Sequence, residues 1–291
     1  MKNSEFSFET VGRGKLTGLL IPGGPGLSAA TMRDDALLLG EIATSYLIDP
    51  PGTGDTPRPI DEGGYLPDSV ATFYRTACAS LALQPDFILG ASYGGLVAVN
   101  MAAQDTRLTR ALVLVSTVIS GIEITNEWDF AESMLTRHQS APWYGSAREV
   151  FDDWTDLILR ATTASEVEEY NARILPLYFD SPDDPAVRAR IEEIAAETRF
   201  DLEAMKIWES GLYQRVDARE AATNITCPTL ILSGESDWLA GPPVSRKTAK
   251  LVPGSTLRII PNCGHMPVVE QPGSYRSLVT DFLHGALDLS S

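Results

Sequence analysis

The chain alternates short apolar runs with longer segments of helical periodicity. The apolar runs, such as LTGLLIP and ALVLVS, are rich in Leu, Ile and Val, which is typical of strands buried on both faces. Strands are expected over residues 5–10, 16–22, 46–49, 87–90, 111–116, 229–233 and 256–260. Helices are expected between them, over residues 32–43, 67–83, 94–104, 244–251 and 274–287. This alternation predicts an α/β fold with a mostly parallel sheet and helices on both faces.

The alternation is interrupted once, by a long segment with helical periodicity and no convincing strand. This segment, residues 120–217, holds four of the five tryptophans: Trp128, Trp143, Trp154 and Trp208. We interpret it as a helical cap inserted after the strand Ala111–Ser116, with residues 1–119 and 218–291 forming the α/β core. Because ligands of open α/β sheets bind at the carboxyl ends of the strands, the cap is expected to cover that edge.

Length and composition fit one soluble domain with a sizeable insertion. The 291 residues are 44% apolar and 21% charged, and no apolar run approaches the ~18 residues of a membrane span. Residues 1–10 lack the apolar stretch of a secretory leader, so we expect a cytoplasmic protein without membrane contact. Three cysteines and three histidines favour neither a disulfide framework nor a metal site.

The charge of the chain is strongly negative and unevenly distributed. The net charge of −16 argues against nucleic acid, whose phosphates attract Lys and Arg. Residues 121–217 carry 21 acidic and 9 basic residues, a net charge of −12. A solvated helical surface explains this excess, and an acidic environment that attracts a cationic substrate is the alternative.

The pentapeptide Gly90-Ala91-Ser92-Tyr93-Gly94 matches the pattern G-x-S-x-G. It follows the expected strand FILG and opens the expected helix GGLVAVN, which is the context that this motif requires. A serine in such a tight turn is presented at the edge of the sheet, at the N-terminus of a helix. Ser92 is therefore the candidate nucleophile.

A nucleophilic serine needs a general base, and His265 is the best candidate. It lies in the segment PNCGHMP, directly after the expected strand TLRII. The triad of this architecture follows the order serine, acid, histidine, and His265 is the histidine that fits this order. His138 falls in the expected cap and His284 on the last expected helix.

The acid that orients the histidine is expected in GESD, after the strand TLILS. Asp237 would hold the imidazole of His265 in one tautomer and stabilise its protonated form. Glu235 in the same turn is the competitor, and Glu123, after the strand ALVLVS, is a weaker candidate.

A glycine-rich segment, Pro22-Gly23-Gly24-Pro25-Gly26, follows the expected strand LTGLLI. Backbone N–H groups in such a loop can stabilise the oxyanion of a tetrahedral intermediate, whereas proline has no N–H to donate. We expect Gly24 N–H and Tyr93 N–H to form the oxyanion hole.

With these motifs placed, the sequence resembles the α/β-hydrolase superfamily over nearly its whole length. The segments GGPG, DPPGTGD, GASYGG, GESD and GHMP occur in that order. Within the superfamily it is most similar to the proline iminopeptidase branch, whose oxyanion motif reads HGGPG. Pro22 stands where that motif has histidine. The resemblance implies a serine triad, a helical cap and acidic cap-side residues that bind the free amino group of the substrate.

The same resemblance suggests three substrate-binding residues. Trp208-Glu209 is similar to a Trp-Glu pair in the cap of that branch. Trp238 directly follows the expected triad acid, at a position where relatives can carry an acidic residue that helps to bind the amine, which a tryptophan cannot do. We therefore name Trp208, Glu209 and Trp238 as candidate substrate-binding residues.

Three functional hypotheses follow. The first is a serine hydrolase that cleaves a small ester, lactone or amide with an apolar or aromatic part through an acyl-enzyme, without metal or organic cofactor. The second is an aminopeptidase acting on short peptides. The third is a lyase, a cyclase or a non-catalytic ligand receptor on the same fold, since fold alone does not determine function. A serine at position 92 excludes epoxide hydrolase and dehalogenase chemistry, which use a carboxylate nucleophile. The sequence leaves the oligomeric state open.

Overall fold

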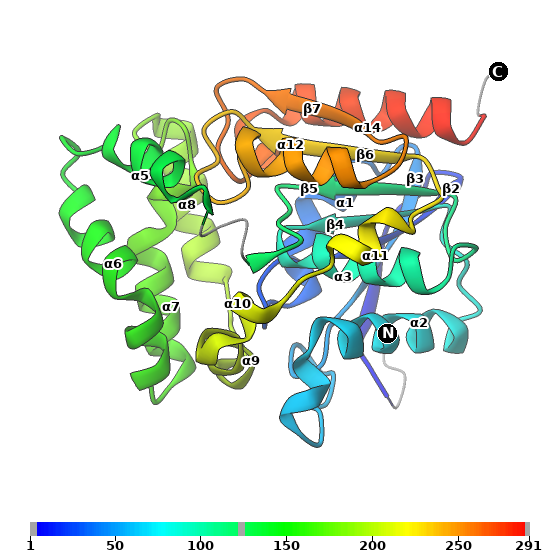
Figure 1. Cartoon of the computed structure of the whole chain (residues 1–291), viewed down its shortest axis with the longest axis horizontal. Coiled ribbons are helices and arrows are strands. Elements are labelled where there is room, and N and C mark those ends of the chain that lie inside the picture. Colours follow the sequence, from blue (N-terminus) through cyan, green and yellow to red (C-terminus); the bar gives the residue numbers. More distant parts are fainter. Residues whose placement is uncertain (1–4, 122–125, 289–291) are drawn as a thin grey trace.

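Seven strands form a single sheet in the order β1-β3-β2-β4-β5-β6-β7 (Figure 1). The computed structural model describes residues 5–121 and 126–288. The strands are β1 (Phe8–Gly12), β2 (Leu16–Ile21), β3 (Ala43–Ile48), β4 (Phe87–Ala91), β5 (Ala111–Val115), β6 (Thr229–Gly234) and β7 (Thr256–Ile260). Among the strands of this described part, β1 pairs with β3 in the antiparallel sense and the other five pairs are parallel. The predicted α/β fold with a mostly parallel sheet is confirmed.

Helices cover both faces of the sheet, each over its own apolar cluster. The helices on one face are α2 (Pro67–Ser80), α3 (Tyr93–Gln104), α11 (Arg219–Thr223) and α12 (Pro242–Leu251). The opposite face carries α1 (Arg33–Leu38) and α14 (Pro272–Ala286). Within residues 5–121 and 126–288, no helix combines the length and apolarity that crossing a bilayer would require.

The expected helix over residues 32–43 is too long. A 3₁₀ turn, η1 (Ala29–Met32), precedes α1, which ends at Leu38. The Gly40 carbonyl then accepts hydrogen bonds from Arg13 N at 2.9 Å and Gly14 N at 3.2 Å. Ala43 already belongs to β3, where it pairs with Leu16. The apolar spacing continues past Leu38 because the first residues of a buried strand are also apolar.

A helical segment separates β5 from β6 and lies beside the sheet (Figure 1). Its elements are α5 (Trp128–Thr136), α6 (Tyr144–Arg160), α7 (Ala164–Ile174), η3 (Leu175–Tyr178), α8 (Pro185–Glu197), α9 (Leu202–Ile207), η4 (Trp208–Leu212) and α10 (Tyr213–Arg215). We refer to the described part of residues 120–217 as the cap. An antiparallel bridge between Ser120 and Asp217 joins the two chain segments that connect it to the sheet.

The cap is attached to the loops that follow β2 and β3. Leu27 forms an antiparallel bridge with Phe200, and Asp201 N donates to Gly26 O at 2.8 Å. The Asp201 carboxylate, 1% exposed, accepts hydrogen bonds from Arg58 Nε at 2.8 Å and from the Tyr65 hydroxyl at 3.2 Å. A buried carboxylate held by a cation and a hydroxyl makes this contact specific rather than a general apolar one.

A buried hydrogen bond joins the two helices on the α1 face. The Tyr275 hydroxyl of α14 donates to Asp35 Oδ1 of α1 at 2.5 Å. Burial raises the pKa of Asp35 from 3.8 to about 6, although the bond from Tyr275 opposes this shift. Because the folded protein holds this proton more tightly than the unfolded chain, the contribution to stability is complete below about pH 4 and is lost as the pH rises through about 6.

In the Asp35→Asn variant the side chain at position 35 is uncharged at every pH. The stability of this variant is therefore not expected to fall as the pH rises through about 6. Relative to wild type, its free energy of unfolding should increase by on the order of 1–3 kcal/mol between pH 5 and pH 8. Thermal unfolding midpoints at several pH values measure this difference. Asp153→Asn, at an exposed site on α6, is the control and should follow wild type. A constant difference between Asp35→Asn and wild type across this range would contradict the prediction.

Candidate functional site

Ser92 occupies a strained turn between β4 and α3. Its backbone lies at φ 51° and ψ −120°, a conformation that costs non-glycine residues ~1–3 kcal/mol. Ser92 N donates to Val115 O of β5 at 2.8 Å, which anchors the turn to the neighbouring strand. A Cβ on Gly90 would lie 2.4 Å from Gly94 O, and one on Gly94 would lie 2.3 Å from Ile21 O. The two glycines of the motif are required by close backbone packing.

Asp237 and His265 are brought together by the turns that follow β6 and β7. His265 Nδ1 lies 3.0 Å from both Asp237 Oδ1 and Asp237 Oδ2. The Asp237 side chain is fully buried, and that of His265 is 9% exposed. Asp237 Oδ1 also accepts hydrogen bonds from Leu239 N and Ala240 N, each at 3.0 Å. These contacts fix the carboxylate and thereby the ring of His265.

The electrostatics of this pair keep Asp237 ionised. Burial by itself raises the pKa of Asp237, but His265 and the backbone donors outweigh it and hold that pKa below its usual range. A carboxylate at this position accepts the Nδ1 proton of His265, so Nε2 is the nitrogen left to accept a proton.

Other predicted acids and histidines lie elsewhere. Glu235 is exposed, and its carboxylate accepts a 3.4 Å bond from Asn262 N. Glu123 lies outside the described residues. His138 packs against Trp143 in the cap, and His284 is exposed on α14. Among the described residues, Asp237 is therefore the acid that contacts His265. In the described structure, no hydrogen bond joins Ser92 Oγ to His265 Nε2. Such catalytic hydrogen bonds are often long in ligand-free sites and shorten when the substrate binds.

The glycine-rich loop after β2 packs against the Ser92 turn. A Cβ on Gly23 would lie 3.5 Å from the Ser92 Cβ. Gly24 has a φ of 122°, and its peptide bond to Pro25 is cis. Tyr93 is the first residue of α3, whose opening N–H groups have no acceptor within the helix. The loop and this helix start, which contain both predicted oxyanion donors, are thus adjacent to Ser92.

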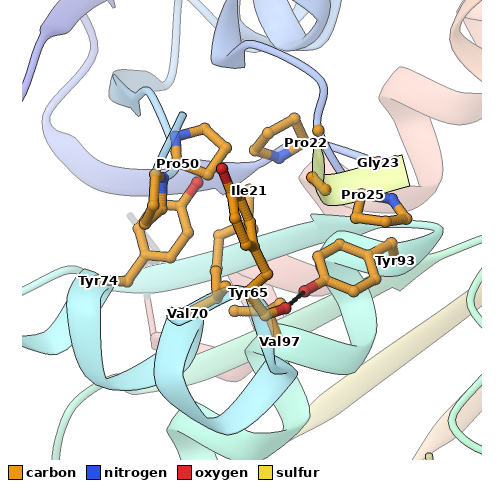
Figure 2. Close-up of a pocket in the computed structure, with 13 residues that line it drawn as sticks. Ile21, Pro22, Gly23, Pro25, Pro50, Tyr65, Val70, Tyr74, Tyr93 and Val97 are labelled. Atoms are coloured by element: carbon orange, nitrogen blue, oxygen red, sulfur yellow. Dashed lines mark hydrogen bonds between the residues drawn. The ribbon is translucent and has the colours of Figure 1, made fainter. Parts of the chain in front are cut away.

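A small cavity lies behind this loop (Figure 2). Its volume of about 20 Å³ suffices for one water molecule. Pro22, Pro25, Tyr74 and Tyr93 are among the residues that line it, and the Tyr93 hydroxyl donates to Tyr65 O at 3.4 Å. Ser92 does not line it. This cavity therefore belongs to the packing of the loop and is too small for an organic substrate.

Aromatic side chains connect the cap to the site. Tyr178 packs edge-to-face on His265, with ring centroids 5.2 Å apart, and on Trp238 at 5.4 Å. Trp238 also packs on Phe151, and its Nε1 is buried without a hydrogen-bond partner in the described structure. Trp208 packs edge-to-face on Tyr93 at 5.3 Å. The structure thus brings Trp238 close to His265 through Tyr178, and Trp208 close to the Ser92 turn.

Glu209, the third candidate substrate-binding residue, is buried in the cap. It lies in the short π-helical segment η4 and is 7% exposed. Its carboxylate accepts hydrogen bonds from Trp154 Nε1 at 2.9 Å and Thr155 Oγ1 at 2.7 Å. Burial raises the pKa of Glu209 despite these two donors. Its partners in the described structure are Trp154 and Thr155, and no Lys or Arg of this part of the chain forms an ion pair with it.

Sequence reasoning does not single out Tyr178 or Glu270, although both contact the histidine turn. Tyr178 lies in a cap segment whose docking position has no local sequence signal. Glu270 follows His265 by five residues in an ordinary local sequence, GHMPVVE. Its carboxylate accepts a hydrogen bond from Gly264 N at 2.6 Å.

The sequence model of the family described as alpha/beta hydrolase fold matches residues 19–272. This chain belongs to the α/β-hydrolase fold family. It is 26% identical over 243 residues to a pimeloyl-[acyl-carrier protein] methyl ester esterase from Neisseria meningitidis, covering 83% of this chain and 68% of the relative. It is 24% identical over 274 residues to a proline iminopeptidase from Lactobacillus delbrueckii, covering 91% and 88%.

Solved structures agree with this family. An enol-lactonase from Burkholderia xenovorans superposes with a TM-score of 0.70 at 18% identity, covering 96% of each chain. At 18% identity, the superposition shows that the two proteins share a fold. Membership of a family of hydrolases, together with these relatives, supports the predicted hydrolase activity.

The Glu209 contacts generate a stability prediction. Trp154→Phe removes a donor from a buried carboxylate and is expected to cost about 1–3 kcal/mol beyond the loss of ring volume. Trp143→Phe is the matched control, because Trp143 Nε1 donates to the exposed Asp183 at 3.1 Å. Thermal unfolding should give the larger decrease for Trp154→Phe, partly recovered by adding Glu209→Gln. Equal decreases for the two tryptophan variants would contradict the prediction.

Proposed function

We propose that the protein is a serine hydrolase in which Ser92, His265 and Asp237 form the catalytic triad. The observation that carries this proposal is the buried pair in which the Asp237 carboxylate holds His265 Nδ1 at 3.0 Å. The strained Ser92 turn at the start of α3 supports it, because this conformation has a stability cost that a purely structural turn does not require.

The proposed reaction has two stages. Ser92 Oγ attacks the carbonyl carbon while His265 Nε2 takes its proton, and Asp237 stabilises the imidazolium. Gly24 N–H and Tyr93 N–H donate to the developing oxyanion. Collapse of the tetrahedral intermediate expels the leaving group, which receives the proton from His265. Water then attacks the acyl-enzyme with His265 again as general base. The bond between the acyl carbon and Ser92 Oγ breaks, Oγ takes the proton back from His265, and the acid product leaves.

The proposed substrate is a small ester, lactone or amide with an apolar or aromatic part. The relatives named above include an esterase, a lactonase and a peptidase, and such enzymes share attack on an acyl carbonyl. The aromatic residues Tyr178, Trp208 and Trp238, next to the proposed triad, support an apolar substrate part. We propose these side chains as part of its binding surface.

A second candidate is an aminopeptidase. It is favoured by Glu209, a buried cap carboxylate without a Lys or Arg partner in the described structure. A protonated amino group of a peptide would supply the missing cation. Against it, the residue after Asp237 is Trp238, which cannot bind an amine as a carboxylate does.

Hydrolysis of prolyl-p-nitroanilide and of p-nitrophenyl butyrate by one preparation separates the two candidates. We expect turnover of the ester and little turnover of the anilide. Ser92→Ala should abolish turnover and covalent labelling by a fluorophosphonate, because it removes the nucleophile. Preference for the anilide would favour the aminopeptidase, and labelling that persists in Ser92→Ala would overturn the proposed nucleophile.

The triad acid can be tested by a matched pair of substitutions. Asp237→Asn should lower kcat by about 10⁴, because an amide cannot hold His265 in the required tautomer. Glu235→Gln, two residues earlier in the same turn but exposed, should change kcat less than about twofold. Steady-state kinetics with p-nitrophenyl butyrate provide the comparison. A larger loss in Glu235→Gln than in Asp237→Asn would assign the acid to Glu235.

A further inference from the structure

One segment of the cap contacts both the turn that carries Asp237 and the turn that carries His265. His265 N donates to Tyr178 O at 2.7 Å, and the Tyr178 ring packs on the imidazole. In the turn that carries Asp237, Ser236 Oγ donates to Asp180 Oδ1 at 2.6 Å. This docked segment, residues 178–181, therefore contacts His265 itself and Ser236, the residue before Asp237.

A single carboxylate joins the docked segment to the histidine turn. Glu270 is the last residue of the short helix α13 (Pro267–Glu270). Its Oε1 accepts hydrogen bonds from Asp180 N at 2.7 Å and Ser181 N at 3.3 Å. Its Oε2 accepts one from Gly264 N, the residue before His265, at 2.6 Å. Both oxygens of Glu270 are thus used, one on the cap and one on the core.

The docked segment also packs closely against the backbone of Gly264. A Cβ on Gly264 would lie 2.3 Å from Tyr178 O, so the docked segment rests directly on the backbone of the histidine turn. Burial raises the pKa of Glu270, although its three backbone donors oppose this. A carboxylate accepts at both oxygens, whereas a glutamine at this position would direct an NH₂ group towards an N–H donor.

We propose that Glu270 is a positioning residue for the reaction, which holds His265 in place and makes its placement depend on the docked cap segment. This inference rests on the proposed function, since it concerns the proposed general base. Glu270 fixes the backbone on the amino side of His265 through Gly264 N, and fixes the segment that supplies Tyr178 O to His265 N. Loss of the carboxylate therefore weakens both of these supports of the His265 ring.

Glu270→Gln tests the proposal against Glu235→Gln. Both changes neutralise a glutamate that accepts a backbone N–H near the histidine turn, but Glu235 is exposed and has one 3.4 Å bond. Fluorophosphonate titration of Ser92 gives the number of active sites in each preparation, and kcat for p-nitrophenyl butyrate is expressed per titrated site. This normalisation removes any effect of a misfolded fraction.

We expect Glu270→Gln to lower kcat per site by tenfold or more, because displacement of a catalytic group by ~1 Å can cost about 10² in rate. KM should change less than threefold, and Glu235→Gln should match wild type. Hydrogen exchange at the amides of Asp180 and Gly264 should be faster in Glu270→Gln. An unchanged kcat per site, or equal losses in the two variants, would overturn the proposal.

Glu270→Asp provides a second test that keeps the charge. Its side chain is one methylene shorter, so it cannot accept hydrogen bonds from the cap amides and from Gly264 N at the same time. We therefore expect kcat per site to fall again at nearly constant KM. Full activity in Glu270→Asp would overturn the proposal even if Glu270→Gln did not fold. If the proposed function itself is wrong, Ser92→Ala retains turnover. If only the role of Glu270 is wrong, Ser92→Ala abolishes turnover while the Glu270 variants keep it.

Discussion

The parallel register of β2, β4, β5, β6 and β7 places the carboxyl ends of these strands at one edge of the sheet. The turns that leave this edge carry Gly24, Ser92, Asp237 and His265, which are far apart in the sequence. No local interaction could hold them near one another. The hydrogen-bonded ladder supplies a rigid base, and close backbone contacts, such as that of Gly94 with Ile21 O, allow the turns to approach.

Much of this arrangement could be predicted from the sequence, because glycines and the residues beside them determine tight turns locally. The segments GASYG and GESD, and the turn around His265, all follow strands as expected. The end of α1 was predicted too late, since the apolar positions of the helix run into those of β3. A periodic pattern reports burial, but it does not mark the residue at which one buried element becomes another.

Contacts between the cap and the core could not be predicted in this way. Tyr178, Asp201 and Glu270 have ordinary local sequences, and their partners lie in distant segments of the chain. Glu209 was named from a Trp-Glu pair, but the sequence contained no sign of its donors, Trp154 and Thr155. Side-chain partners across an interface depend on docking geometry, which a single sequence does not encode in a readable pattern.

The attachment of Asp201 to Gly26 and Arg58 has a consequence for how such a protein can change during evolution. The cap contacts the glycine-rich loop through Asp201 and the histidine turn through Tyr178, so it is part of the framework of the site. A lid joined only by its hinges could be exchanged for another without loss of the chemistry. Here an exchanged lid would have to bring its own equivalents of Asp201 and Tyr178, so new specificities are more accessible through substitutions within the existing cap.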